Sequence, residues 1–237
     1  MNHKFVKVIV SLLAIFSLTS ANALLIRVSQ ESAAGAGDFD ANVLGNIASF
    51  DTALSISAFY DYGNPDGASY NGQLNGGPDT VSGMTQIFLH NGSDGVSLVV
   101  VHDRANDGSG GSTRTQWVLA GDTATFGVID DPGEGVGVFD GNTRFVSSKV
   151  WFSCCTDGYT IGALDGNWSM IGGFLAAPTG INSLQATSAN NANIALDLST
   201  RRVRLDLAPT ISVAEPGMLT LALLGLAGLG VRRVLKR

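Results

Sequence analysis

The sequence predicts an all-β protein, a single antiparallel β-sandwich or jelly-roll-like domain with an apolar segment at each end of the chain. Turn signals are the first observation behind this fold class. Six Asp-Gly and three Asn-Gly pairs lie between residues 66 and 166, and such pairs tolerate the positive φ angles of tight turns. The runs between these pairs alternate apolar and polar residues, as half-buried strands do. The chain also has 30 glycines, which disfavour helices.

The first apolar segment has the order of a secretory signal peptide. Lys4 and Lys7 precede an apolar run over residues 8–18, and Ala21-Asn22-Ala23 forms a small-x-small cleavage site. The apolar run is shorter than the roughly 20 residues that a membrane-spanning helix needs. We therefore expect export, removal of residues 1–23 by signal peptidase, and a mature chain that begins near Leu24.

The body of the protein is expected over residues 24–212, and its strands are predicted in chain order. Residues 54–60 alternate apolar with small or polar side chains, as in a strand. Residues 61–85 are rich in Gly, Asn and Asp without periodicity, which predicts a long loop. The stretch QIFLHNGSDGVSLVVVH, residues 86–102, predicts a hairpin that turns at 91–95.

Three further strand patterns follow in the second half of the body. Residues 115–129 predict a second hairpin, with apolar alternation on both sides of a Gly-Asp turn. Residues 143–152 predict a single strand. Residues 193–208 predict a closing hairpin, because the apolar positions of its two halves can face each other.

The charge of the body excludes some partners. Residues 24–213 contain eight basic and nineteen acidic residues, a net charge of −11, whereas six of the chain's 14 basic residues lie in the two terminal segments. This balance argues against a nucleic-acid partner, because phosphate backbones favour clustered cations. It argues equally against docking on anionic lipid. It is compatible with divalent cations, and also with a simple contribution to solubility.

Two acidic loops offer oxygen ligands for calcium, the one cofactor that the sequence suggests. Asp103 and Asp107 lie in a glycine-rich loop, and Asp130, Asp131 and Glu134 lie in a second loop. Calcium binds carboxylate and carbonyl oxygens, so one site built from both loops is a prediction. The spacing is not that of an EF-hand loop, and two ordinary acidic turns are the alternative.

Adjacent cysteines, Cys154 and Cys155, leave three interpretations open. An exported protein meets oxidising conditions, which favours a disulfide. Neighbouring Cα atoms are about 3.8 Å apart, below the usual disulfide range of about 4.4–6.8 Å, so a bond between them requires a distorted peptide. The alternatives are two thiols, or metal ligands that His90 and His102 could complete.

The body shows no motif of a known catalytic chemistry. The sequence has no G-x-S-x-G, H-E-x-x-H or P-loop pattern, and we expect a non-catalytic surface or matrix protein. A carbohydrate- or calcium-binding module of lectin type is the first alternative. It would use Trp117, Trp151 and Trp168 as a stacking platform if they are exposed, although core packing is the expected role of the first two. A secreted hydrolase with facing carboxylates is the second alternative.

The second apolar segment lies at the C-terminus. Residues 218–231 contain no charge and are followed by four basic residues, Arg232, Arg233, Lys236 and Arg237. As a helix this run covers about 21 Å, against about 30 Å for a hydrocarbon core. It is a short membrane span whose basic tip would stay on the cytoplasmic side by the positive-inside rule.

What precedes this run suggests how the protein is handled. Ala214-Glu215-Pro216, the apolar stretch LALLGLAGLG and the basic tip resemble the PEP-CTERM sorting signal of Gram-negative envelope proteins, with Ala214 where that family usually has its first proline. The resemblance covers residues 213–237. It implies processing near Glu215-Pro216 by an exosortase-type transpeptidase, in bacteria that make exopolysaccharide. We therefore expect an exported protein that is first held at the inner membrane and is then sorted to the envelope or released. The alternative is that the segment is an unprocessed anchor.

Overall fold

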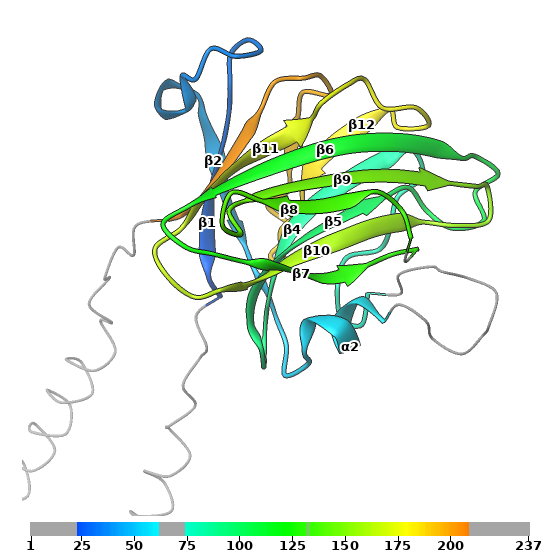
Figure 1. The fold of residues 1–237 in the computed structure, drawn as a ribbon, viewed down its shortest axis with the longest axis horizontal. Helices are drawn as coiled ribbons and strands as arrows, with labels where there is room; N and C mark the ends of the chain where they lie inside the picture. Colours follow the sequence, from blue (N-terminus) through cyan, green and yellow to red (C-terminus); the bar gives the residue numbers. More distant parts are fainter. Residues whose placement is uncertain (1–22, 62–73, 132, 209–237) are drawn as a thin grey trace, which may run out of the picture.

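The protein is a sandwich of two β-sheets, as the sequence predicts (Figure 1). The computed structural model describes residues 23–61, 74–131 and 133–208. Residues 1–22 of the expected signal peptide, the whole of the expected sorting segment with its apolar run and basic tip, and residues 62–73 of the loop predicted at 61–85 lie outside these residues. Among the residues described, no helix is both long and apolar enough to cross a membrane.

Each sheet has seven strands. In spatial order the first sheet contains β2 (Val43–Ala48), β1 (Leu25–Gln30), β14 (Val203–Leu207), β11 (Ser169–Phe174), β6 (Gly111–Ala120), β9 (Arg144–Trp151) and β8 (Val136–Phe139). The second sheet contains β13 (Ile194–Leu196), β12 (Ser183–Ala186), β4 (Met84–Gly92), β5 (Gly95–His102), β10 (Asp157–Leu164) and β7 (Thr125–Ile129), with β3 (Phe50–Asp51) beside β4. Within the described ranges the helical elements are a 3-10 turn, η1 (Phe39–Ala41), and one short α-helix, α2 (Ile56–Tyr60).

Two apolar clusters hold these elements together. The larger lies between the sheets and joins residues of both, such as Trp117 and Met170 from the first and Leu98 and Ile161 from the second. The smaller lies on the outer face of the second sheet, where α2 covers Phe88. Since side chains alternate along a strand, β4 directs its odd-numbered Ile87 and Leu89 into the larger core and its even-numbered side chains outward.

The prediction of a wholly antiparallel sheet is wrong at one place. β12 and β3 both run parallel to β4, while the other paired strands are antiparallel. The hairpin predicted at residues 86–102 is confirmed, because β4 and β5 pair from Thr85 opposite His102 to Gly92 opposite Gly95. The strand predicted at 143–152 is confirmed as β9.

The other two predicted hairpins are wrong, because the chain changes sheets at their turns. β6 pairs with β11 and β9 in the first sheet, whereas β7 pairs with β10 in the second. Likewise β13 pairs with β12, whereas β14 pairs with β1 and β11. At the second crossing the side chain of Gln30 bonds both the N–H and the carbonyl of Asp197, at 2.8 and 3.0 Å. The apolar face of a strand can be buried in either sheet of the sandwich. Alternation alone therefore does not determine with which strand it pairs.

The strand predicted at residues 54–60 is also wrong, because this segment forms α2. Ser55 caps the helix by accepting a hydrogen bond from the N–H of Ala58, at 3.3 Å. Ile56, Phe59 and Tyr60 are spaced as one helical face and are all buried. Over so short a run, the apolar pattern fits both the two-residue period of a strand and the 3.6-residue period of a helix. The helix forms because it packs its buried side chains against β4 and β5.

Candidate functional site

A polar hollow on the outer face of the second sheet is a candidate binding site among the described residues. We call it the amide groove, and its volume is about 470 Å³. Its lining residues are Phe50, Gly77, Pro78, Asp79, Val81, Met84, Gln86, Gln185, Thr187, Ser188, Ala189, Asn191 and Asn193. Six of these carry amide or hydroxyl side chains.

Strand register places two glutamines side by side in the amide groove. Gln86 of β4 is the direct partner of Gln185 in the parallel strand β12, so both side chains leave the sheet on the same face. Gln185 donates a hydrogen bond to the hydroxyl of Thr187 at 3.1 Å. Phe50 adds an aromatic ring, which packs edge-on against Phe88 with centroids 5.2 Å apart. The floor thus combines amides with one apolar ring.

The rim of the amide groove is a turn that its own side chains organise. The amide oxygen of Asn193 accepts a hydrogen bond from the N–H of Ser188 at 2.9 Å, and Asn190 accepts one from the Ser188 hydroxyl at 2.6 Å. The same hydroxyl accepts from the N–H of Ala48, which ties the turn to β2. A rim held in this way is formed before a ligand arrives, which lowers the entropic cost of binding.

The tryptophans do not form a binding platform. Trp117, Trp151 and Trp168 are 1%, 3% and 4% exposed, so the platform that the lectin alternative requires of them is excluded. Trp117 donates its indole N–H to the hydroxyl of Tyr159, and Trp151 donates its own to Asp103, both at 2.9 Å. Each satisfies its polar group inside the protein, as buried indoles usually do.

Asp103 and Asp107, two of the predicted calcium ligands, form hydrogen bonds with the residues that precede β4. Asp103 accepts hydrogen bonds from the N–H of Gly83 at 2.7 Å and from the Ser109 hydroxyl at 3.0 Å. Asp107 accepts from the hydroxyl of Ser82 at 2.5 Å. Residues 82 and 83 follow the Pro78–Val81 wall of the amide groove directly. These carboxylates therefore position that wall.

The second acidic loop meets a buried lysine. Lys149 lies on the inner face of β9 and is fully buried. Its Nζ is 3.0 Å from Oε2 of Glu134 and 3.2 Å from Oδ1 of Asp157, and it donates a hydrogen bond to the carbonyl oxygen of Asp130. We call these four residues the lysine cluster. It spans the sandwich, because Lys149 belongs to the first sheet and Asp157 begins β10 in the second.

Burial dominates the acid–base behaviour of the lysine cluster. Asp130 and Asp157 are fully buried, and loss of solvation raises the pKa of each to about 8. Tyr60 donates to Oδ2 of Asp130 at 3.1 Å and counteracts part of this rise. Among the described residues, Oδ1 of Asp130 and Oδ2 of Asp157 have no hydrogen-bond partner.

The five predicted calcium ligands do not meet at one place. Asp131 and Glu134 bring carboxylate oxygens within 4.8 Å of an oxygen of Asp157, whereas Asp103 and Asp107 belong to the separate network around Ser82. The positive charge that contacts Glu134 and Asp157 is the ammonium group of Lys149. Calcium binding stays a prediction. The sequence reasoning missed Asp157, and it missed Lys149, although this is the only lysine between residues 8 and 235.

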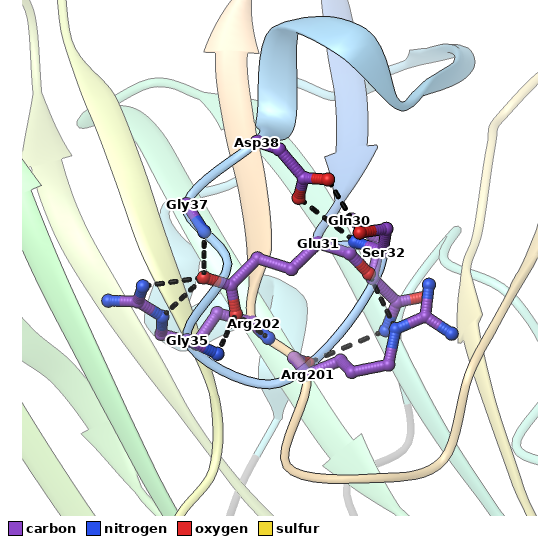
Figure 2. A network of polar contacts seen from close by, with 8 residues as sticks. All are labelled: Gln30, Glu31, Ser32, Gly35, Gly37, Asp38, Arg201 and Arg202. Atoms are coloured by element: carbon purple, nitrogen blue, oxygen red, sulfur yellow. Dashed lines mark hydrogen bonds and ion pairs between the residues drawn. The ribbon is translucent and has the colours of Figure 1, made fainter.

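A second buried carboxylate, Glu31, is fully satisfied (Figure 2). Oε1 accepts from the N–H of Gly37 and from two nitrogens of the Arg202 side chain, while Oε2 accepts from the N–H groups of Gly35 and Arg202. The Arg202 guanidinium is the largest cause that lowers the pKa of Glu31 to about 2. This network closes the 31–37 loop onto the segment before β14, a structural role.

Cys154 and Cys155 are joined by a disulfide in the structure. The bond lies in the segment between β9 and β10. The carbonyl of Cys154 accepts a hydrogen bond from the N–H of Asn106 at 3.1 Å, which links this segment to the loop that carries Asp103 and Asp107. His90 contacts Thr52, and His102 lies between the hydroxyls of Thr85 and Thr113.

A scan against protein-family models finds no match for this chain, and searches among curated proteins and solved structures find none either.

Proposed function

We propose that the chain is an exported envelope protein whose body binds neutral polysaccharide in the amide groove, without catalysis, and whose tail is processed by an exosortase-type transpeptidase. The body would first be held at the inner membrane by residues 218–231 and then be sorted or released. Gln185 carries the binding part of this proposal, with Phe50 beside it and the buried Gln86 as its neighbour in the sheet.

The chemistry of the amide groove supports a sugar ligand. An amide side chain both donates and accepts hydrogen bonds, as does each hydroxyl of a sugar. An aromatic ring such as Phe50 complements the apolar face of a pyranose. The net charge of −11 over residues 24–213 disfavours anionic polymers, so a polysaccharide of neutral hexoses fits best.

Titration calorimetry with oligosaccharides of glucose and of mannose tests the binding part. We expect the wild type to bind one of them and Gln185→Leu to weaken that binding about tenfold, as loss of a hydrogen bond to a ligand would. Gln116→Leu is the matched control, because Gln116 lies on the outer face of the first sheet, away from the groove. Absence of binding by the wild type, or equal binding by both variants, would contradict the proposal.

The order of Glu215-Pro216, apolar run and basic tip supports the sorting part. A plain anchor depends on hydrophobicity and flanking charge, which a double change of Glu215→Ala and Pro216→Ala leaves almost intact. We expect this variant to accumulate as full-length protein in the membrane fraction, while the wild type gives a shorter processed form. Blots of membrane and released fractions measure the ratio of the two forms. Identical ratios would identify the tail as an unprocessed anchor.

A further inference from the structure

Lys149 is singular in both sequence and structure. It is the only lysine between residues 8 and 235, and the other seven basic residues of the body are arginines. It is also the one cationic side chain among the described residues that is fully buried. A lysine can lose its proton in a protein interior and act as a nucleophile, whereas an arginine cannot.

The geometry around Nζ is that of a nucleophile beside an acyl group and a proton carrier. Nζ lies 3.2 Å from Oδ1 of Asp157 and 3.0 Å from Oε2 of Glu134. The N–H of Gly158 donates a hydrogen bond to Oδ1 of Asp157 at 2.6 Å, so this oxygen has a donor ready for developing negative charge. Oδ2 of Asp157, by contrast, has no hydrogen-bond partner in the described part of the chain.

We propose that Lys149 and Asp157 condense to an intramolecular amide bond, with Glu134 as the proton carrier, and that this bond links the two sheets of the sandwich.

The reaction needs no group that the chain lacks. A proton first moves from the Lys149 ammonium group to Oδ2 of Asp157, which converts the ion pair into an amine and a carboxylic acid. The amine then attacks Cγ of Asp157, and a C–N bond forms. Negative charge collects on Oδ1, where the N–H of Gly158 stabilises it. Glu134 takes a proton from Nζ and passes it to the Oδ2 hydroxyl, which leaves as water when the C–O bond breaks. The products are one amide and one water molecule, and Glu134 returns to its carboxylate form.

The surroundings favour this chemistry. Burial raises the pKa of Asp157, which makes transfer of a proton onto its carboxylate less costly. Amide formation also replaces a buried ion pair, whose desolvation is costly, by a neutral group. The other titratable groups nearby are Asp130, Asp131, Tyr60 and His102. Burial keeps the His102 pKa at about 3, with a smaller contribution from the charge of Lys149, so His102 adds no second cation at neutral pH.

Mass spectrometry of the purified mature protein tests the amide directly. After reduction and alkylation, the intact mass should be one water molecule lower than the mass calculated for the alkylated sequence. Trypsin should fail to cut after Lys149 in the denatured chain. Because the flanking arginines are Arg144 and Arg201, both partners then remain in one peptide, residues 145–201, which also lacks one water.

An amine-reactive label distinguishes the amide from a second dehydration. Asp157-Gly158 could lose water as a backbone succinimide, but that product leaves the Lys149 amine free. Under denaturing conditions the amide predicts no label on Lys149. A labelled Lys149 with the mass of one water missing, or a full mass with cleavage after Lys149, would each overturn the proposal.

Two variants assign the roles. Lys149→Met removes the nucleophile and keeps a long apolar stem, and it should show the full mass expected for its sequence. Glu134→Gln keeps both reacting groups, so it should show full mass, a labelled Lys149 and an unchanged β-sheet circular-dichroism spectrum. Complete amide formation in Glu134→Gln would refute the role of Glu134 while leaving the bond itself. The wild-type measurement stands regardless of how the variants fold.

Discussion

At the scale of the residue, two buried carboxylates show how partners decide acid–base behaviour. Glu31 receives five hydrogen bonds, three of them from Arg202, and its pKa falls to about 2. Asp130 accepts a hydrogen bond from the Tyr60 hydroxyl, and burial raises its pKa to about 8. At Glu31 the hydrogen bonds from Arg202 outweigh desolvation. At Asp130 desolvation is the largest contribution, and the bond from Tyr60 offsets only part of it.

The raised pKa of Asp130 predicts that stability falls as pH rises. Between its ordinary pKa of 3.8 and about 8, the folded protein keeps a proton on Asp130 that the unfolded chain has lost. Folding then takes up a proton, so the free energy of unfolding decreases with rising pH over this range. Asp130→Asn should remove that decrease and raise stability at pH 8 by on the order of a few kcal/mol.

Urea unfolding at a series of pH values between 4 and 8 measures this effect. Tyr60→Phe serves as the comparison, because it removes the hydroxyl that stabilises the carboxylate form of Asp130. In Tyr60→Phe the free energy of unfolding should still decrease with rising pH, and the decrease should continue to a higher pH than in the wild type. Parallel pH profiles for the wild type and Asp130→Asn would show that Asp130 is ionised in the folded protein, contrary to the prediction.

At the scale of the element, alternation located several strands, misassigned residues 54–60, and did not identify the partner of each strand. The β4–β5 hairpin was predictable because its turn at residues 91–95 joins two strands that also pair. The turns after β6 and after β13 carry the same kind of signal, yet there the chain crosses to the other sheet. The alternation of apolar and polar residues predicts which side chains of a strand face the core. It does not predict to which of the two sheets the strand belongs. Contacts far apart in sequence, such as Gln30 with Asp197, make that choice.

The candidate sites were predictable to different degrees for the same reason. The acidic loop at residues 130–134 was visible as a cluster of carboxylates. Its partners, Lys149 and Asp157, come from two strands in different sheets, so no spacing along the chain reveals them. The amide groove was invisible, because Gln86 and Gln185 meet only through the parallel pairing of β4 with β12.

At the scale of the whole molecule, the two ends of the body lie together. β1 and β14 are neighbours beside the edge strand β2 of the first sheet, with Ile26 opposite Leu207. The N–H of Ala208 then bonds the carbonyl of Leu25 at 2.9 Å. The fully buried members of the main core all lie between Ile26 and Leu205. The body is thus closed by its own first and last strands, and Leu25 and Ala208 lie side by side.

This closure predicts that residues 24–212 fold without the C-terminal segment. The core is contained in them, and their charge keeps the folded form soluble. The fragment should be monodisperse on size exclusion, give a β-type circular-dichroism spectrum and unfold cooperatively on heating. A fragment of residues 24–202 is the control, because it lacks β14 and so leaves β1 and β11 without the strand between them. It should fail to fold, since the loss exposes two inner strand edges and removes Val203 and Leu205 from the core. Aggregation of the longer fragment with a helical spectrum would show that the body depends on its tail for folding.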